Sequence, residues 1–428
     1  MRGVYVLLLI SLLGYTGRVS GQESVTITQC YEWARANYPQ IHQMGLIDQT
    51  ERYSLSNVGK AWLPQLPVSG KASYQSDVTK LPLDGDKISS LLPGFEIPSL
   101  SKDQYQVVAQ VDQTIWDGGS TRSARALTRA EAIANREQLE SELYALNDRV
   151  NQIYFGCLLQ DELIRQNALL QKELQVNIER IEAMMENGVA NQSDLESMEV
   201  ELLNARQNEI ELKASRTVYR QMLATFINKP LTDQVVLKTP ESPERSLSTQ
   251  INRPELRALD AKSEWIETQN KQVTAGLMPR IGAFVQGGYG RPGLNMLEDS
   301  FEPYYVAGVR LSWNLGKLYT LKNDRRKIEV SRRQIDVQRE TFLFNTRLQL
   351  LQQNTEIKKM TDLMRADDDI IRLRTSIKQA AEVKLENGVI SVTDLIREIN
   401  AEDMARQTAA AHRVQRLMTI YNYMYTTN

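Results

Sequence analysis

The sequence is poor in the residues that build catalytic centres, metal sites and disulfide frameworks. Its only two histidines, His42 and His412, lie in separate helical segments, so no histidine-based catalytic or metal cluster is expected. Its only two cysteines, Cys30 and Cys157, both fall in helical patterns, which favours packed apolar thiols over a disulfide. Carboxylates are plentiful but lie on charged helical faces, where solvation explains them. The sequence therefore predicts no enzyme, cofactor or metal site.

The sequence also lacks an excess of charge of one sign. The predicted mature chain lacks any long apolar run. The 51 basic and 53 acidic residues nearly balance, and no basic patch points to nucleic acid. Residues 1–21 join a short charged start, an apolar stretch and small residues, which is typical of a secretory signal peptide with cleavage near Gln22. No later run of about 18 apolar residues exists, so no transmembrane helix is expected. A membrane contact of this exported chain must use strands.

A short motif occurs twice in the chain, and its surroundings predict a bend. Glu-Asn-Gly-Val stands at residues 186–189 and again 200 residues later at 386–389, each time interrupting a long helical pattern and followed by Asp-Leu. Asn-Gly is a turn signal, because glycine adopts a positive φ without steric cost. Ser193 and Thr393 are expected to cap the helix that follows each bend. Each copy therefore predicts the bend of a very long helical hairpin.

Further landmarks recur in the same order and indicate that the chain is duplicated. They are Pro39, Pro64 and Trp116 in the first half, and Pro254, Pro279 and Trp313 in the second. The first copy has about 18 more residues between its second proline and its tryptophan. We assign these extra residues to a loop at 81–103, because insertions in loops cost little.

The landmarks give a predicted division of the mature chain. The first repeat covers 22–227, with a β-hairpin at about 66–116 and a helical-hairpin tip at 187–193. Residues 228–252 form a linker or equatorial segment. The second repeat covers 253–428, with a β-hairpin at about 281–314 and a tip at 387–393.

Apolar and polar residues alternate in each predicted strand, as in Tyr105–Trp116, which gives each strand one apolar face. Such a sheet can pack on a core with one wet face. Export, aromatic residues near strand ends and the lack of a helix to cover the sheet instead favour a lipid-facing sheet. A lipid-facing sheet must have no open edge. Two copies would supply eight strands, whose interior side chains fill, and three copies twelve, enough for a channel.

Long helical patterns fill the rest of the two halves. The patterns at 118–186 and 317–386 are each about 70 residues long, which corresponds to about 105 Å. A heptad seam predicts coiled-coil packing in the first, at Leu139, Leu143, Leu146, Val150, Ile153 and Cys157. The returning helices at 191–227 and 392–425 are shorter. We expect each to stack end to end with the helix at 26–62 or 254–277.

Taken together, these features resemble the TolC family of outer-membrane efflux proteins over essentially the whole mature chain. The resemblance rests on the two Gly-Val bends with a downstream Asp, the proline before each first strand, the Trp-Asp-Gly-Gly type of exit from each second strand, at Trp116 and Trp313, and the duplication. It implies a mixed α/β, mostly α fold, in which three chains form a 12-stranded β-barrel on an α-helical barrel. The barrel would lie in the outer membrane of a Gram-negative bacterium and the helices in the periplasm.

The resemblance also implies a function and partners. The function is a passive exit duct for efflux or type I secretion, in a homotrimer that meets outer-membrane lipid. A periplasmic adaptor (membrane fusion protein) and an inner-membrane transporter would complete a tripartite pump. The alternative is an exported periplasmic coiled-coil scaffold or adaptor-like protein. Such a scaffold would not extract with the outer membrane.

Candidate site residues follow from the family motifs. Gly188, Val189, Gly388 and Val389 match the tips that adaptor hairpins contact in the family, although glycine there also serves the turn alone. Asp394 matches an acidic ring that narrows the closed pore, and Asp194 is its counterpart; both also fit as first-turn residues that favour the helix dipole.

Three further positions complete the set. Arg397 stands in the constriction region, where the family has a second acidic position, so a second acidic ring is not expected. Asp112 and Arg310 fall on the predicted lumen faces of strands, either tuning what passes or lining a wet pore.

Overall fold

The computed structural model describes residues 24–79, 100–242, 250–296 and 298–428. The predicted signal peptide and most of the predicted 81–103 loop lie outside these ranges. The chain divides into two compact units. The bend unit comprises residues up to His42, Leu139–Pro254 and Thr341–Asn428, and the sheet unit comprises Gln43–Gln138 and Glu255–Glu340.

No described helix is both long and apolar enough to span a membrane.

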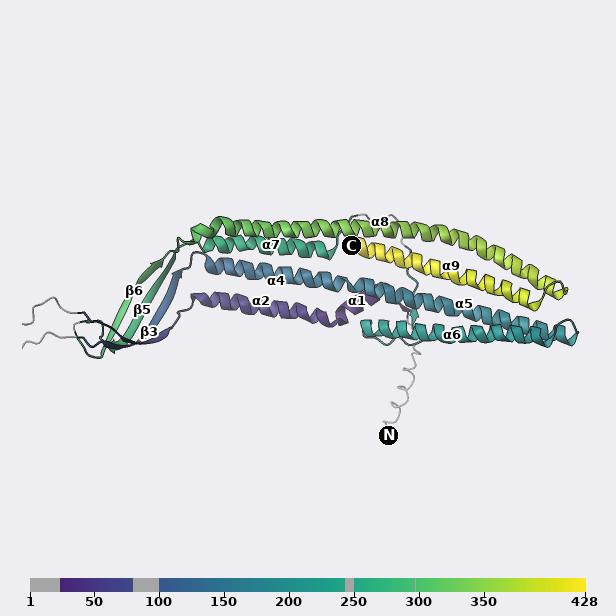
Figure 1. Ribbon diagram of the computed structural model, residues 1–428, viewed down its shortest axis with the longest axis horizontal. Coiled ribbons are helices and arrows are strands. Elements are labelled where there is room, and N and C mark those ends of the chain that lie inside the picture. Colours follow the sequence, from purple (N-terminus) through teal and green to yellow (C-terminus); the bar gives the residue numbers. More distant parts are fainter. Residues whose placement is uncertain (1–23, 80–99, 243–249, 297) are drawn as a thin grey trace, which may run out of the picture. The chain divides into compact units, whose positions relative to one another are not determined.

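The sheet unit contains four antiparallel strands (Figure 1). They are β2 (Val68–Tyr74), β3 (Asp103–Trp116), β5 (Arg280–Arg291) and β6 (Glu302–Ser312), in the spatial order β2-β3-β5-β6. Each half of the chain supplies one hairpin, and the two hairpins join through the β3–β5 pairing. The halves therefore pair side by side in this unit.

The strand register gathers the apolar residues on one face of the sheet. Val111 pairs with Val285, which pairs with Ala307, and Val107 pairs with Gly70 and Tyr289. Side chains on this face are exposed, including Val68, Tyr105, Val107, Val111, Val285, Tyr289, Tyr305, Val309 and Leu311. The polar face, with Gln106, Gln110 and Asp112, is only half-exposed. The apolar face is thus the more open of the two.

The exit from β3 explains the Trp-Asp-Gly-Gly sequence. The carboxylate of Asp117 accepts hydrogen bonds from the amides of Gly119 at 2.9 Å and Thr121 at 2.6 Å, which caps the start of α4 (Ser120–Tyr144). Gly118 has φ +67°, and a Cβ there would lie 2.6 Å from Cβ of Met278. Only glycine fits this close approach.

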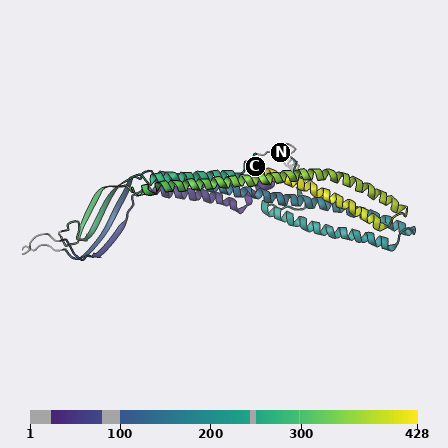
Figure 2. The same ribbon diagram turned by 45° about the horizontal axis from the view of Figure 1, so that its top comes forward.

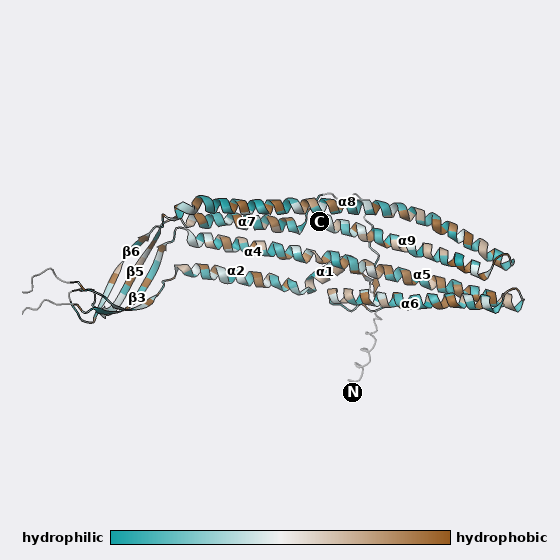
Figure 3. Cartoon of the chain, viewed as in Figure 1, coloured by the Kyte–Doolittle hydropathy of each residue, from teal (hydrophilic) through white to brown (hydrophobic). Residues whose placement is uncertain are grey.

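Helices make up the rest of the sheet unit. They include α2 (Gln43–Gly59), the 3₁₀ turn η2 (Lys60–Trp62), the first part of α4, most of α7 (Pro254–Ala275) and the start of α8 (Lys317–Glu386). Ile266 of α7 packs with Ile328 and Ile335 of α8. Figure 3 shows apolar positions recurring between polar ones along these helices.

The bend unit is built from helices that run to the two bends and back. It contains α1 (Ile27–Asn37), a 3₁₀ turn η1 (Pro39–His42), α5 (Leu146–Glu186), α6 (Gln192–Ile227), the second part of α8, and α9 (Val392–Thr427). All six residues of the predicted heptad seam are at most 5 % exposed. Cys30 and Cys157 are free and buried in the same apolar cluster. The predicted packed thiols are confirmed, and burial raises the pKa of each to about 12.

The segment between the halves contributes to that cluster. Strand β4 (Val236–Leu237) pairs in parallel with β1 (Ser24–Val25). The buried hydroxyl of Tyr154 on α5 lies 2.9 Å from the carbonyl oxygen of Val25 and 2.7 Å from that of Lys238. The start of the described chain and the inter-repeat segment are therefore held on the same helix.

In the first half, two helix ends meet in the bend unit, as the length argument predicts, and in the second half the end of α9 contacts the segment before α7. The side-chain amide of Asn37, at the end of α1, donates to the carbonyl oxygen of Ile227, at the end of α6, at 3.1 Å. The amide of Asn252 donates at 2.7 Å to the carbonyl oxygen of Thr427, at the end of α9.

Two details differ from the sequence prediction. The helix predicted at 118–186 is divided at Ala145, where α4 ends and α5 begins, although Ala145 keeps helical angles with φ −61° and ψ −16°. The predicted caps Ser193 and Thr393 are wrong. The caps are Asn191 and Ser391, two residues earlier, because these residues have extended backbones and aspartate stands three positions later.

Candidate functional site: the two helical bends

Each bend closes its first helix in the same way. In the first, the amide of Gly188 donates to the carbonyl of Met185 at 2.9 Å, and that of Val189 to the carbonyl of Met184 at 2.8 Å. This pair of bonds is a Schellman motif, which needs a left-handed residue. Gly188 supplies it with φ +70°.

The second bend repeats this geometry. The amides of Gly388 and Val389 donate to Leu385 and Lys384, both at 2.9 Å, and Gly388 has φ +67°. The side-chain amides of Asn187 and Asn387 each donate at 2.7 Å to the carbonyl four residues earlier. Identical local bonding thus follows from the repeated Glu-Asn-Gly-Val sequence.

The next helix begins with a reciprocal cap in both bends. Asn191 accepts from the amide of Asp194 at 3.1 Å, and the Asp194 carboxylate accepts from the amide of Asn191 at 3.1 Å. Ser391 and Asp394 form the same pair at 3.2 Å in each direction, and the Ser391 hydroxyl adds a bond of 2.7 Å. The bonds from Ser391 lower the pKa of Asp394 below its usual value. Asp194 and Asp394 therefore stabilise the helix starts.

Arg397 lies one turn after Asp394 on α9. Its Nη1 atom is 3.3 Å from Oδ1 of Asp394, and both side chains are exposed. The structure thus pairs these two candidate constriction residues within one helix. An exposed pair of this kind contributes little to stability.

The bends present apolar side chains to solvent. Val189 and Val389 are 57 % and 68 % exposed. The residue in this place of a Schellman motif often packs back onto the helix, whereas more than half of each valine here is exposed. No atom lies within 4 Å of a Cβ built at Gly188 or Gly388. The surface at each bend is therefore open enough for another chain to approach the backbone closely.

The two bends lie side by side, as both views show (Figure 2). One apolar cluster joins residues from all four helices, including Ile181 of α5, Met198 of α6, Leu385 of α8 and Leu395 of α9. Polar contacts cross between the hairpins as well, with Arg180 Nε 3.7 Å from Glu386 and Asn400 Nδ2 3.3 Å from Glu201.

A buried ionic cluster lies farther along the helices, and the sequence analysis missed it. The side chain of Glu402 on α9 is 3 % exposed and lies 2.6 Å from Nζ of Lys378 on α8. Lys378 also contacts Glu173 on α5, and Glu402 accepts from Thr375 at 2.6 Å and from Nε of Arg406 at 3.0 Å. The cluster therefore connects the two hairpins.

The cluster perturbs two neighbouring carboxyl groups in opposite directions. Burial alone would raise the pKa of Glu402, but hydrogen bonds from Lys378, Thr375 and Arg406 outweigh it and lower the pKa to about 2. The next residue, Asp403, has its pKa raised to about 6, mainly by burial and partly by the charge of Glu173. Glu402 is therefore ionised over the physiological range, whereas Asp403 titrates within it.

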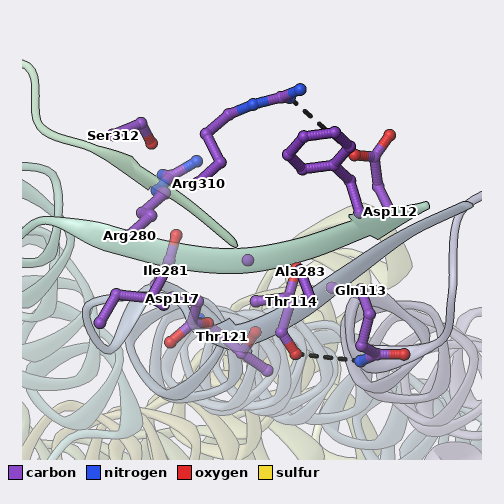
Figure 4. Close-up of a pocket in the computed structure, with 14 residues that line it drawn as sticks. Asp112, Gln113, Thr114, Asp117, Thr121, Arg280, Ile281, Ala283, Arg310 and Ser312 are labelled. Atoms are coloured by element: carbon purple, nitrogen blue, oxygen red, sulfur yellow. Dashed lines mark hydrogen bonds and ion pairs between the residues drawn. The ribbon is translucent and has the colours of Figure 1, made fainter. Parts of the chain in front are cut away.

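The candidate lumen residues come together in the sheet unit. Nη1 of Arg310 on β6 is 3.9 Å from Oδ1 of Asp112 on β3, and its guanidinium lies over the ring of Phe284, 4.8 Å from the centroid. Figure 4 shows both charged side chains on the same side of the sheet. They line a cavity of about 300 Å³ with Arg280 and Thr114. Within the described residues, no group of three or more His, Cys, Asp or Glu side chains is arranged to hold a metal.

Comparison with known proteins shows a family resemblance over part of the chain. Residues 30–229 match the outer membrane efflux protein family. This match confirms the predicted resemblance to TolC-like outer membrane efflux proteins. No curated protein matches the chain.

Solved structures match the fold across nearly the whole chain. The outer membrane protein VceC of Vibrio cholerae is 12 % identical with a TM-score of 0.65, covering 93 % of this chain and 95 % of its own. The outer membrane channel MtrE of Neisseria gonorrhoeae is 14 % identical, with a TM-score of 0.63 and coverages of 94 % and 88 %. CusC, whose structures describe transmembrane channel formation, is 14 % identical, with a TM-score of 0.66 and coverages of 94 % and 92 %. At these identities the likeness establishes the fold.

Proposed function

We propose that this protein is the outer-membrane exit duct of a tripartite efflux or secretion system. The exposed apolar face of the four-stranded sheet carries the proposal, because no described helix covers it. An exported sheet that leaves such a face open needs an apolar environment, and a bilayer supplies one. The duct conducts passively, and its partners supply the energy.

The proposed assembly is a trimer. Strands β2 and β6 each have one edge without a strand partner among the described residues. A lipid-facing sheet must close these edges, and pairing β6 of one copy with β2 of the next closes them. Three copies give a 12-stranded barrel, wide enough to conduct, above an α-helical barrel. Asp112 and Arg310, on the polar face, then line the lumen.

The proposed partners are a periplasmic adaptor and an inner-membrane transporter. The bends suit docking because Val189 and Val389 are exposed and nothing lies within 4 Å of a Cβ at either glycine. Schellman geometry requires the glycine but not an exposed valine after it. Docking thus explains a feature that the turn does not.

We also propose that Asp194, Asp394 and Arg397 lie at the closed end of the duct. In the proposed trimer three copies of each would face the pore, and a ring of carboxylates attracts cations. Asp394→Asn should then lower the cation selectivity of single channels in a planar bilayer. Unchanged selectivity would leave Asp394 as a capping residue only.

Native mass after gentle extraction tests the proposal most directly. The full chain is expressed with its leader, outer membranes are separated, and the protein is extracted in a mild neutral detergent. A trimer in that fraction is the expected result. A monomer, or protein released by a salt wash without detergent, would contradict the duct and favour an exported coiled-coil scaffold.

A further inference from the structure

A basic groove lies at the foot of the sheet, where β3 passes into α4. It has a volume of about 870 Å³ and runs between α4 and α7, with Trp62 of η2 at one side. Four cationic residues line it, namely Arg122, Arg125, Arg129 and Lys271. All of these residues belong to the sheet unit.

The three arginines form one stripe on α4. Positions 122, 125 and 129 share a helix face, since residues three and four apart are neighbours. All three side chains are exposed. Arg125 lies across Gly59, at the end of α2, where a Cβ would be 3.0 Å from its Nη2 atom. The glycine therefore leaves room for this guanidinium beside the groove.

These cations have no carboxylate partner among the described residues. None of the four takes part in an ion pair, unlike Arg136 on the same helix, which pairs with Asp48 at 2.9 Å and also with Glu51. The single acidic side chain in the groove, Asp117, is occupied by the amides of Gly119 and Thr121. The groove thus carries uncompensated positive charge.

The groove adjoins the end of the apolar sheet face. The last exposed aromatic residues there, Trp116 after Ile115 on β3 and Trp313 just after β6, come a few residues before the first turns of α4 and α8. Tryptophan side chains favour the interface between bilayer and water. From Arg122 to Arg129 the helix rises about 10 Å, which is enough to cross a headgroup layer of about 5–8 Å. Trp62, 39 % exposed, also lines the groove.

We propose that this groove binds the phosphodiester headgroup of an anionic phospholipid in the periplasmic leaflet. The inference rests on the proposed membrane insertion of the sheet. The guanidinium groups of Arg122, Arg125 and Arg129 offer forked N–H donors that match phosphate oxygens. Lys271 adds a fourth positive charge from α7, and Trp62 packs against the glycerol end of the lipid.

The fluorescence of Trp62 supplies a local test in the full-length protein. A single-tryptophan background replaces Trp33, Trp116, Trp265 and Trp313 by Phe, and its native mass is checked against the parent. The protein is reconstituted in phosphatidylcholine vesicles that contain brominated phosphatidylglycerol or, in parallel, brominated phosphatidylcholine at the same fraction. Quenching gives the association constant of each lipid at Trp62.

We expect the anionic lipid to quench more strongly at equal fraction. The triple variant Arg122→Gln/Arg125→Gln/Arg129→Gln should remove the preference, because each cation near the surface is worth about a fivefold change. The matched control Arg149→Gln/Lys172→Gln/Arg206→Gln removes three exposed charges of the bend unit and should keep the preference. Equal quenching by the two lipids in the parent protein would overturn the lipid site.

Two further outcomes distinguish a failure of the lipid site from a failure of the proposed duct. If neither brominated lipid quenches Trp62, the sheet does not meet the bilayer and the proposed duct fails as well. The second arm adds soluble glycerol phosphate to phosphatidylcholine vesicles. If the anion changes Trp62 fluorescence in the parent but not in the triple variant, while the two lipids quench equally, the groove takes a free phosphate ester, and the lipid assignment is wrong.

Discussion

The two helical hairpins of the bend unit have the same bends but different interiors. In the first, Ile178 and Leu202 are 5 % and 7 % exposed and belong to the apolar cluster. At the equivalent positions 200 residues later stand Lys378 and Glu402, whose side chains are 13 % and 3 % exposed and form an ion pair. An apolar contact in one half is thus replaced by a buried ionic contact in the other.

This difference shows which parts of a repeat are fixed locally and which depend on a neighbour. The bends stay alike because a positive φ at Gly188 and Gly388 is a local requirement. The ion pair of the second hairpin depends on its neighbour, because Lys378 also contacts Glu173 on α5 of the first hairpin. A buried charge needs partners of fixed geometry, and Lys378 finds them on both hairpins, in Glu173 of α5 and Glu402 of α9.

The largest effect, a loss of transport, is expected from substitutions at the bends, which have the same geometry in both hairpins. Gly188→Trp and Gly388→Trp should each abolish transport while the trimer stays intact, because the new side chain fills the open surface at the bend. Drug accumulation in cells measures transport, and native mass measures assembly. Full transport with an intact trimer would show that the docking assignment is wrong.

Gly188→Asn and Gly388→Asn are the matched controls for backbone strain. Asparagine adopts the left-handed conformation at low cost, so the bend should persist. Reduced transport in these variants would show that partners need the space above the glycine. Unequal effects at residues 188 and 388 would mean that the partners do not use the two bends equivalently.

Replacing the ion pair of the second hairpin by the apolar residues of the first is expected to change the stability of the fold, with a smaller effect on function than the bend variants have. Lys378→Ile alone removes one of the two cations that contact Glu402 and leaves Arg406 as the other, so it should cost about 1–3 kcal/mol. The double variant Lys378→Ile/Glu402→Leu, which copies the first hairpin, should recover most of that loss. Thermal unfolding in detergent, followed by circular dichroism, compares the variants. Equal loss in the single and double variants would show that Glu402 and Lys378 are not coupled.

The smallest expected effect depends on pH and arises from Asp403. Its pKa is about 6 in the fold and about 3.9 in an unfolded chain, so the folded state binds the proton more tightly. Stability contributed by this group is therefore full below about pH 4 and falls as pH rises to about 6. The pKa of Glu402, lowered to about 2, acts oppositely, since its contribution is lost only as pH falls from about 4 towards 2.

Asp403→Asn should remove the decline between pH 4.5 and pH 7.5, a change of about 1–2 kcal/mol. The apparent unfolding temperature of the variant, relative to the parent, should therefore be higher at pH 7.5 than at pH 4.5. Asp369→Asn, on a side chain that is 70 % exposed, is the control and should shift both values equally. A parallel pH dependence of Asp403→Asn and the parent would contradict the assignment.

The sequence pattern was sufficient where structure depends on local periodicity. The seam from Leu139 to Cys157 is buried throughout, because its heptad spacing alone places those side chains on one helix face. Alternation likewise placed Val107, Val111 and Val285 on one sheet face. The starts of the returning helices were predicted to within a residue, but their caps were misassigned, although aspartate three residues after Asn191 and Ser391 is a capping-box signal.

The buried ionic cluster could not be predicted from sequence pattern, for a different reason. Lys378 and Glu402 stand on helices rich in charge, where solvated faces are the usual interpretation. Their burial depends on Glu173, a residue on α5 that only the tertiary fold brings near. The useful signal was the comparison of halves, because residues 178 and 202 are apolar where residues 378 and 402 are charged.

The pairing of β1 with β4 constrains how the chain acquires its structure. Ser24 and Val25 pair with Val236 and Leu237, so the first strand of the described chain pairs with a segment more than 200 residues later. Contacts of such long range form slowly. Until they form, the apolar residues of the cluster that contains Val25 and Leu237 stay exposed, which makes the incomplete chain prone to aggregation. The order of the segments in the sequence therefore delays the burial of this part of the core until the segment between the two repeats has been synthesised.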